Sequence, residues 1–287
     1  MPALTIKLAF SLMLEVRGLR LSLPDRGHKP AFGRTPMLEI LKGVDLSVPA
    51  GASVGVVGES GSGKSTLART LVRLYRPTAG TIVFDGEEVG SLEGMALRSL
   101  RTRMQMVFQD SQSALNPRLR IGTILADPFI VHGRVRTTTE ALARAEALLE
   151  QVGLSRQYLF RYPHQLSGGQ RQRIGIARAI ALGPRLVLAD EIVSGLDVSV
   201  QVQILELLST LRASTGMAVV LISHDLSVVR TFCDSVIVMR HGEIVEAGPT
   251  ASLFEAPQHP YTRRLLRAIP LPEVDPSWID SVNLIED

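Results

Sequence analysis

A glycine-rich segment early in the chain has the residues and the spacing to bind the phosphates of a nucleotide. It fits the pattern G-x-x-x-x-G-K-[ST] and consists of Gly58, Glu59, Ser60, Gly61, Ser62, Gly63, Lys64 and Ser65, followed by Thr66. Glycines let the backbone approach phosphate oxygens with its N–H groups turned inward. In such a loop Lys64 would reach the β- and γ-phosphates, and the Ser65 hydroxyl would bind Mg²⁺. A glycine-rich turn that binds nothing is the alternative.

Two carboxylates close a short apolar segment farther along the chain. Leu186–Ala189 is apolar and is followed directly by Asp190 and Glu191. The carboxyl ends of strands are where open α/β sheets bind ligands. There Asp190 could hold the water shell of a metal ion, and Glu191 could polarise an attacking water as a general base. An ordinary buried strand followed by two solvated acids is the alternative.

A third segment opens a predicted helix over residues 168–182. It contains Ser167, Gly168, Gly169 and Gln170, preceded by Leu166. The serine hydroxyl, the free backbone N–H groups and the helix dipole at such a start favour an anion such as a γ-phosphate. For a Ser-Gly-Gly sequence alone, an ordinary helix cap is the alternative.

The phosphate loop and the Leu166–Gln170 segment together offer two half-sites for one triphosphate. This combination resembles the ATP-binding cassette (ABC) family, whose ATPase subunits work in pairs, and the resemblance covers residues 14–248. It implies that Gln109 senses Mg²⁺ and water, and that His224 contacts the γ-phosphate. It also implies that Ser194–Asp197 crosses the interface between two subunits.

The resemblance predicts ATP and Mg²⁺ as cofactors and divides the site residues by role. The predicted catalytic residues are Glu191, His224 and Gln109, and the predicted metal-binding residues are Ser65, Gln109 and Asp190. Nucleotide binding is assigned to the phosphate loop with Thr66 and to the segment from Ser167 to Gln170.

Three further segments resemble the ATPase subunits of oligopeptide, dipeptide and nickel importers. The first is residues 109–118, which begin with the predicted glutamine, and the second is Arg161–His164. The third is the tail His259–Leu266, followed by Ala268 to Pro270. Together they favour this branch and its F-type rather than its D-type subunit. A terminal helix that merely packs on the core is the alternative for the tail.

The chain departs from the ABC pattern at several positions. Ile192 and Gly195 stand where the family usually has Pro after the catalytic Glu and Ala in the interface segment. A missing proline changes the rigidity of a turn more than its chemistry, so hydrolysis is expected to survive. Thr35 lies near the position of the aromatic residue that stacks on adenine, with Phe32 as the nearest substitute. Cys233 alone cannot supply the iron–sulfur cluster that some ATPases of this branch carry.

The elements that must position these residues alternate between strand and helix. Strands are predicted at 14–23, 44–48, 53–57, 82–84, 104–108, 186–189, 218–223, 235–239 and 243–245. Helices are predicted at 64–74, 137–152, 168–182 and 198–211, and a surface loop at 24–36. This alternation implies a mostly parallel sheet with helices on its faces.

Residues 111–165 are predicted to form a helical subdomain. Leucines and alanines recur at helical spacing over 137–152, with Thr139 or a neighbour as the cap and Gly153 as the end. The predicted fold is thus α/β, a P-loop NTPase cassette of the ABC type. It has a mostly parallel core, an antiparallel β part and this helical insertion. The predicted domains are 14–248 for ATP binding and 249–287 for a C-terminal tail.

Length, charge and cysteine content exclude several classes. The 287 residues suit one large domain or a core with a subdomain, and a net charge of +3 gives no reason to predict a nucleic-acid partner. A single cysteine excludes an internal disulfide and any multi-cysteine metal site within the chain. No apolar run approaches the ~20 residues of a membrane-spanning helix. Met1–Met13 lacks a small-residue cleavage site, so it is not interpreted as a signal peptide, and Met13 is the expected natural start.

The predicted function is ATP hydrolysis that powers uptake of oligopeptides or dipeptides across the bacterial inner membrane. The predicted partners are a second ABC ATPase subunit in a hetero- or homodimer, two membrane permease subunits and, indirectly, an extracytoplasmic substrate-binding protein. The chain would lie peripherally on the cytoplasmic face of the membrane.

Three alternatives stay open. The transported solute could be nickel, a glutathione-like peptide or an oligosaccharide. Ile192 and Gly195 would allow a weakly hydrolysing or non-hydrolysing regulatory subunit. A soluble ABC ATPase of translation or DNA maintenance is disfavoured, because such proteins have two cassettes per chain or long coiled coils between the motifs.

Overall fold

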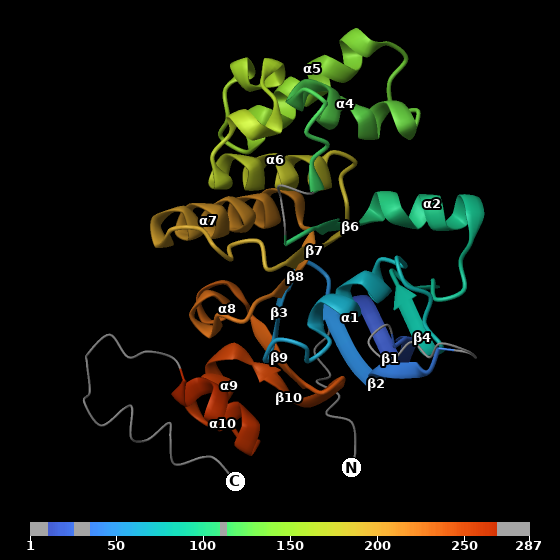
Figure 1. The fold of residues 1–287 in the computed structure, drawn as a ribbon, viewed down its shortest axis with the longest axis vertical. Helices are drawn as coiled ribbons and strands as arrows, with labels where there is room; N and C mark the ends of the chain where they lie inside the picture. The colour runs from blue at the N-terminus through green and yellow to red at the C-terminus, as the bar shows by residue number, and fades with distance from the viewer. Residues whose placement is uncertain (1–10, 26–34, 110–113, 269–287) are drawn as a thin grey trace.

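A six-stranded, mostly parallel sheet forms the centre of the protein (Figure 1). The structure is a computed structural model that describes residues 11–25, 35–109 and 114–268. The strands lie in the order β10-β9-β3-β8-β7-β6, and only the pair β9–β10 is antiparallel. Their bounds are β3 Ser53–Val57, β6 Met104–Val107, β7 Leu186–Asp190, β8 Ala218–Ile222, β9 Ser235–Arg240 and β10 Glu243–Pro249.

The burial of the central strands explains their composition. Every residue of β3, β7 and β8 is buried, as expected for parallel strands covered on both faces. Because neighbouring parallel strands end at the same edge, the loops after β3, β6, β7 and β8 meet there. These are the loops that carry the predicted site residues.

A second, antiparallel sheet has the order β2-β1-β4-β5. Its strands are β1 Leu12–Pro24, β2 Met37–Pro49, β4 Ala79–Phe84 and β5 Glu87–Glu88. The prediction placed the start of β2 seven residues too late, because pairing continues until Pro24 faces Met37. The predicted loop at 24–36 is closed by a hydrogen bond from the Asp25 N–H to the Pro36 carbonyl, 2.8 Å long. Phe32 lies outside the described residues.

The helices flank the central sheet and extend beyond one side of it (Figure 1). Their bounds are α1 Lys64–Leu71, α2 Gly94–Arg103, α4 Ile121–Val131, α5 Thr138–Gln151, α6 Gly168–Ile180, α7 Val198–Thr215, α8 Leu226–Phe232, α9 Thr250–Glu255 and α10 Pro260–Arg267. Short 3₁₀ turns, η1 Arg156–Phe160 and η2 Pro163–Gln165, precede α6. In the part of the chain that the structure describes, no helix is long and apolar enough to cross a membrane.

The observed ends of α5 and α1 can be compared with the predicted ones. In α5 the cap is Thr137, whose hydroxyl accepts the Glu140 N–H at 3.1 Å, and Gly153 follows the helix with φ of 70°. By contrast, α1 ends at Leu71, three residues before the predicted end. Arg73 has φ of 59° there, and its guanidinium donates to the carbonyls of Val89 and Leu92. The N–H groups of Leu74 and Arg73 donate to the carbonyls of Arg69 and Thr70, so the backbone closes the helix in a Schellman ending. Because Arg73 rather than glycine occupies the left-handed position, the sequence carries no glycine stop signal there.

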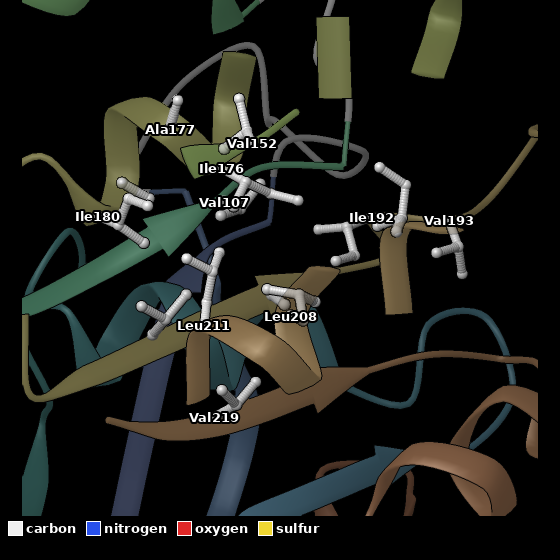
Figure 2. Packing of buried hydrophobic residues seen from close by; sticks show 14 of the residues in the cluster. Val107, Val152, Ile176, Ala177, Ile180, Ile192, Val193, Leu208, Leu211 and Val219 are labelled. Atoms are coloured by element: carbon white, nitrogen blue, oxygen red, sulfur yellow. The ribbon is translucent and has the colours of Figure 1, made fainter. Parts of the chain in front are cut away.

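Two apolar clusters hold the layers together. One lies between the antiparallel sheet, α1 and one face of the central sheet. The other joins the opposite face to α6, α7 and the helices α4 and α5, and Figure 2 shows side chains of β6, β8, α6 and α7 within it. Ile192 and Val193, which follow β7, are part of this second cluster (Figure 2).

Candidate nucleotide-binding site

The phosphate loop between β3 and α1 depends on glycine at several positions. Gly58, Gly61 and Gly63 have φ of 150°, 81° and 102°, a region that other residues rarely adopt. A Cβ atom on Gly58 would overlap the carbonyl oxygen of Met239 at the end of β9. Gly63 caps α1, and Thr66 lies in its first turn. Glu59, Ser60 and Gly61 are exposed at the rim of the loop.

The Lys64 side chain folds back over this loop. Its ammonium donates to the carbonyl oxygens of Gly58 at 2.6 Å and Glu59 at 2.8 Å, and it lies 3.5 Å from the Ser62 hydroxyl. Burial lowers the pKa of Lys64, while Glu191, Asp190 and Glu59 oppose that shift. The positive charge is thus held among the backbone oxygens of the loop.

Asp190 lies against the same helix start at the end of β7. One carboxylate oxygen, Oδ1, accepts a hydrogen bond from the Ser65 hydroxyl at 2.8 Å. The other, Oδ2, is buried and has no hydrogen-bond partner among the described residues. Burial raises the pKa of Asp190, although the Ser65 hydrogen bond opposes it. A hydroxyl beside a carboxylate with an unpartnered oxygen fits a hard divalent cation such as Mg²⁺, which prefers oxygen ligands.

The predicted catalytic side chains meet at the ends of three adjacent strands. Glu191 Oε2 accepts a hydrogen bond from Gln109 Nε2 at 2.8 Å and lies 3.4 Å from His224 Nδ1. Gln109 follows β6, Glu191 follows β7 and His224 follows β8, so the strand order explains their proximity. Glu191 itself has φ of 48°, a left-handed conformation that residues other than glycine rarely adopt.

The Leu166–Gln170 segment forms a separate group at the start of α6. The Ser167 hydroxyl accepts the Gln170 N–H at 3.3 Å, and the Gln170 side chain accepts the Ser167 N–H at 3.0 Å. This reciprocal pair is a capping box. A Cβ on Gly169 would lie 2.5 Å from Val200 of α7, so the helix start packs closely against its neighbour. Among the described residues, Ser167 has no hydrogen-bond partner in the phosphate loop.

The structure reveals two tyrosines that the sequence analysis missed. Tyr158 Oη accepts a hydrogen bond from Gln170 Nε2 at 3.0 Å, and Tyr261 Oη accepts one from the Glu59 N–H at 3.0 Å. Tyr261 belongs to the tail segment already singled out, but it stands 202 residues from its partner. Sequence spacing therefore gave no sign of this contact.

Family models match two parts of this chain. Residues 41–194 match the family model described as ABC transporter, and residues 245–285 match the model described as oligopeptide/dipeptide transporter, C-terminal region. The chain belongs to the ABC transporter family. Its predicted α/β cassette fold and its role as an ATPase subunit are thereby confirmed. The match at 245–285 begins within β10 and includes α10.

Individual relatives and structures agree with this assignment. A putative peptide import ATP-binding protein of Brucella ovis is 48% identical over 263 residues, covering 92% of this chain and 80% of the relative. The oligopeptide transport ATP-binding protein OppF of Bacillus subtilis is 46% identical over 234 residues, covering 80% and 77%. A dimeric ATP-binding cassette, MJ0796, in a post-hydrolysis state bound to ADP and Pi, gives a TM-score of 0.73. It is 31% identical in sequence, and the match covers 83% of this chain and 99% of that one.

Proposed function

We propose that this chain is the ATP-hydrolysing subunit of an importer that takes up oligopeptides or dipeptides across the bacterial inner membrane. The match of residues 245–285 to the C-terminal region of oligopeptide and dipeptide transporters carries this proposal. The printed names of the relatives from Brucella ovis and Bacillus subtilis support it. In this proposal the ATP-binding domain spans 14–248 with a helical insertion at 111–165, and the tail spans 249–287.

We assign the steps of ATP binding and hydrolysis to residues that lie together at the sheet edge. The amides of the phosphate loop and the Lys64 ammonium bind the phosphates, in place of the carbonyl oxygens that Lys64 now contacts. Ser65, Asp190 and Gln109 would hold Mg²⁺, which when bound would offset negative charge on the phosphates. Glu191 accepts the proton of the attacking water, and His224 beside it contacts the γ-phosphate.

The second half-site belongs, in this proposal, to a partner subunit. Ser167 is exposed at a helix start where the capping box leaves the N–H groups of Gly168 and Gly169 to meet an anion. Among the described residues it has no bond to the phosphate loop of its own chain. A second ATPase subunit would present its own Ser167 equivalent across the interface. Two permease subunits and an extracytoplasmic binding protein complete the transporter, with this chain on the cytoplasmic face of the membrane.

Uptake of labelled peptides tests the proposed substrate. Cells that carry the native chain are expected to accumulate labelled di- and oligopeptides, and cells that carry Glu191→Gln are expected to lose that uptake. The same cells are assayed with labelled nickel. Loss of nickel uptake with unchanged peptide uptake would contradict peptide import and point to the other solute.

Ile192→Pro tests whether the missing proline limits hydrolysis. Ile192 is 1% exposed and belongs to the same apolar cluster as Val107 and Leu208, so its role in the structure is apolar packing (Figure 2). The ATPase rate of the purified variant is expected to stay within about threefold of the parent, because no catalytic contact changes. A tenfold or greater rise in phosphate release would show that the parent is a weakly hydrolysing subunit.

A further inference from the structure

Helix α10 reaches the phosphate loop through the side chain of Tyr261. The Glu59 N–H, at the start of the loop, donates a hydrogen bond to the Tyr261 hydroxyl oxygen at 3.0 Å. Glu59 directly follows Gly58, whose backbone passes beside the Met239 carbonyl. The contact therefore lies at the point where the chain leaves β3 and turns to form the loop.

Tyr261 is held firmly from several directions. Tyr261 is 2% exposed, so its ring is almost wholly removed from solvent. The guanidinium groups of Arg240 and Arg264 lie 5.0 and 5.7 Å from its ring centroid, within the range of cation–π attraction. Arg240 ends β9 and Arg264 belongs to α10, so the ring is fixed between the sheet and its own helix.

The beginning of α10 is in turn fixed to the central sheet. The Glu246 carboxylate, on β10, accepts the N–H groups of Gln258 at 2.8 Å and His259 at 3.0 Å. His259 Nδ1 then accepts the N–H of Tyr261 at 3.1 Å. A continuous series of hydrogen bonds thus runs from β10 through the helix start to Tyr261 and the phosphate loop.

The backbone N–H and the backbone carbonyl of Glu59 are both hydrogen-bonded, the carbonyl from within the loop and the N–H from outside it. Its carbonyl accepts the Lys64 ammonium at 2.8 Å and the Ser62 N–H at 3.2 Å, both from within the loop. Its N–H is held from outside the loop by Tyr261. Binding of phosphates by the Lys64 ammonium would draw it away from this carbonyl, whereas the Glu59 N–H is already bonded to Tyr261 and would be left to that partner. The tyrosine can therefore keep the loop in place while Lys64 changes partners.

We propose that Tyr261 is a positioning residue of the nucleotide site, through which the C-terminal helix fixes the start of the phosphate loop in the conformation that binds a nucleoside triphosphate. This inference rests on the nucleotide-binding role proposed above. It makes the tail part of the ATP site rather than a helix that merely packs on the core.

Tyr261→Phe in the full chain tests the proposal, because phenylalanine keeps the ring and its two arginine contacts and removes only the hydroxyl. Hydrogen exchange of the Glu59 amide is expected to speed up by at least about tenfold, since its partner is lost. Binding of a fluorescent ATP analogue is expected to weaken by about three- to tenfold, with KM for ATP raised and kcat changed by less than about twofold. Tm is expected to stay within about 3 °C of the parent.

Matched variants separate a positioning role from a purely structural one. Tyr75→Phe removes the hydroxyl of a half-buried tyrosine that packs on the cluster between the antiparallel sheet and the central sheet, whereas Tyr261 belongs to the cluster on the opposite face. This variant is expected to leave ATP binding unchanged. Glu246→Gln weakens the anchor of α10 without touching the loop, and it is expected to weaken ATP binding in the same direction as Tyr261→Phe.

Failure of the proposal for Tyr261 can be distinguished from failure of the proposed nucleotide site. If Tyr261→Phe and Glu246→Gln both bind the analogue as the parent does, and Glu59 exchange is unchanged, Tyr261 does not position the loop, even if Tm falls. Lys64→Ala serves as the reference for the site itself and is expected to abolish binding of the analogue. If Lys64→Ala binds as tightly as the parent, the proposed nucleotide site is wrong, and the role of Tyr261 falls with it.

Discussion

Glu191→Gln is expected to slow ATP hydrolysis by about 10²- to 10⁴-fold while leaving ATP binding intact. Glutamine has the size of glutamate but cannot accept the proton of the attacking water. Its side-chain oxygen can still accept the hydrogen bond from Gln109 Nε2, so the residue should keep its place beside His224. Phosphate release under saturating ATP measures the rate, and equilibrium binding of a fluorescent analogue measures the affinity.

The same substitution should also trap a dimer. Because binding of ATP would join two half-sites and hydrolysis would separate them, a variant that binds without hydrolysing should accumulate in the closed, ATP-bound state. Size-exclusion chromatography with and without ATP detects it. Glu206→Gln, on the exposed face of α7, is the matched control and should hydrolyse ATP at the parental rate. Normal turnover in Glu191→Gln would remove Glu191 as the base.

The sequence predicted which residues lie at the ends of the central strands better than it predicted the tertiary contacts around them. Gln109, Glu191 and His224 each follow an apolar strand, and parallel strands bring such positions together. The apolar runs of β3, β7 and β8 are short, wholly buried and bounded by clear signals, which explains why these strands were predicted within two residues. Gln109 and His224 were assigned through the resemblance to the ABC family, and the order of the parallel strands explains why they lie beside Glu191.

The contacts that escaped prediction depend on segments distant in sequence. The strand β2 begins at Met37 rather than at Val44 because its pairing with β1 continues as far as Pro24, a partner outside the local sequence of residues 37–43. At the early end of α1 the left-handed position is occupied by Arg73 rather than by glycine, and the Arg73 guanidinium bonds to the carbonyls of Val89 and Leu92, which lie far along the chain. The contact of Tyr261 with Glu59 has the same cause: no local signal specifies a partner 202 residues away.

Gly58→Ala is expected to lower kcat/KM for ATP by about 10²-fold, since a shift of about 1 Å in a positioning element has an effect of that size. A Cβ at residue 58 would overlap the Met239 carbonyl and approach the Ser62 hydroxyl to 2.9 Å. Met239 belongs to a buried central strand paired to β3, so it is the loop rather than the sheet that must move. The displaced loop would carry its N–H groups and Lys64 away from the phosphates. Steady-state phosphate release at varied ATP concentration gives kcat/KM.

A matched glycine separates this overlap from simple backbone strain. Gly86, in the turn between β4 and β5, also has positive φ, 80°, but a Cβ there meets no atom within 4 Å. Gly86→Ala is therefore expected to lose about 1–2 kcal/mol of folding free energy while its kcat/KM stays parental. If both alanine variants lose ATPase activity only in proportion to their unfolded fraction, the phosphate loop tolerates displacement. In that case the close approach of Gly58 to β9 would serve folding rather than nucleotide binding.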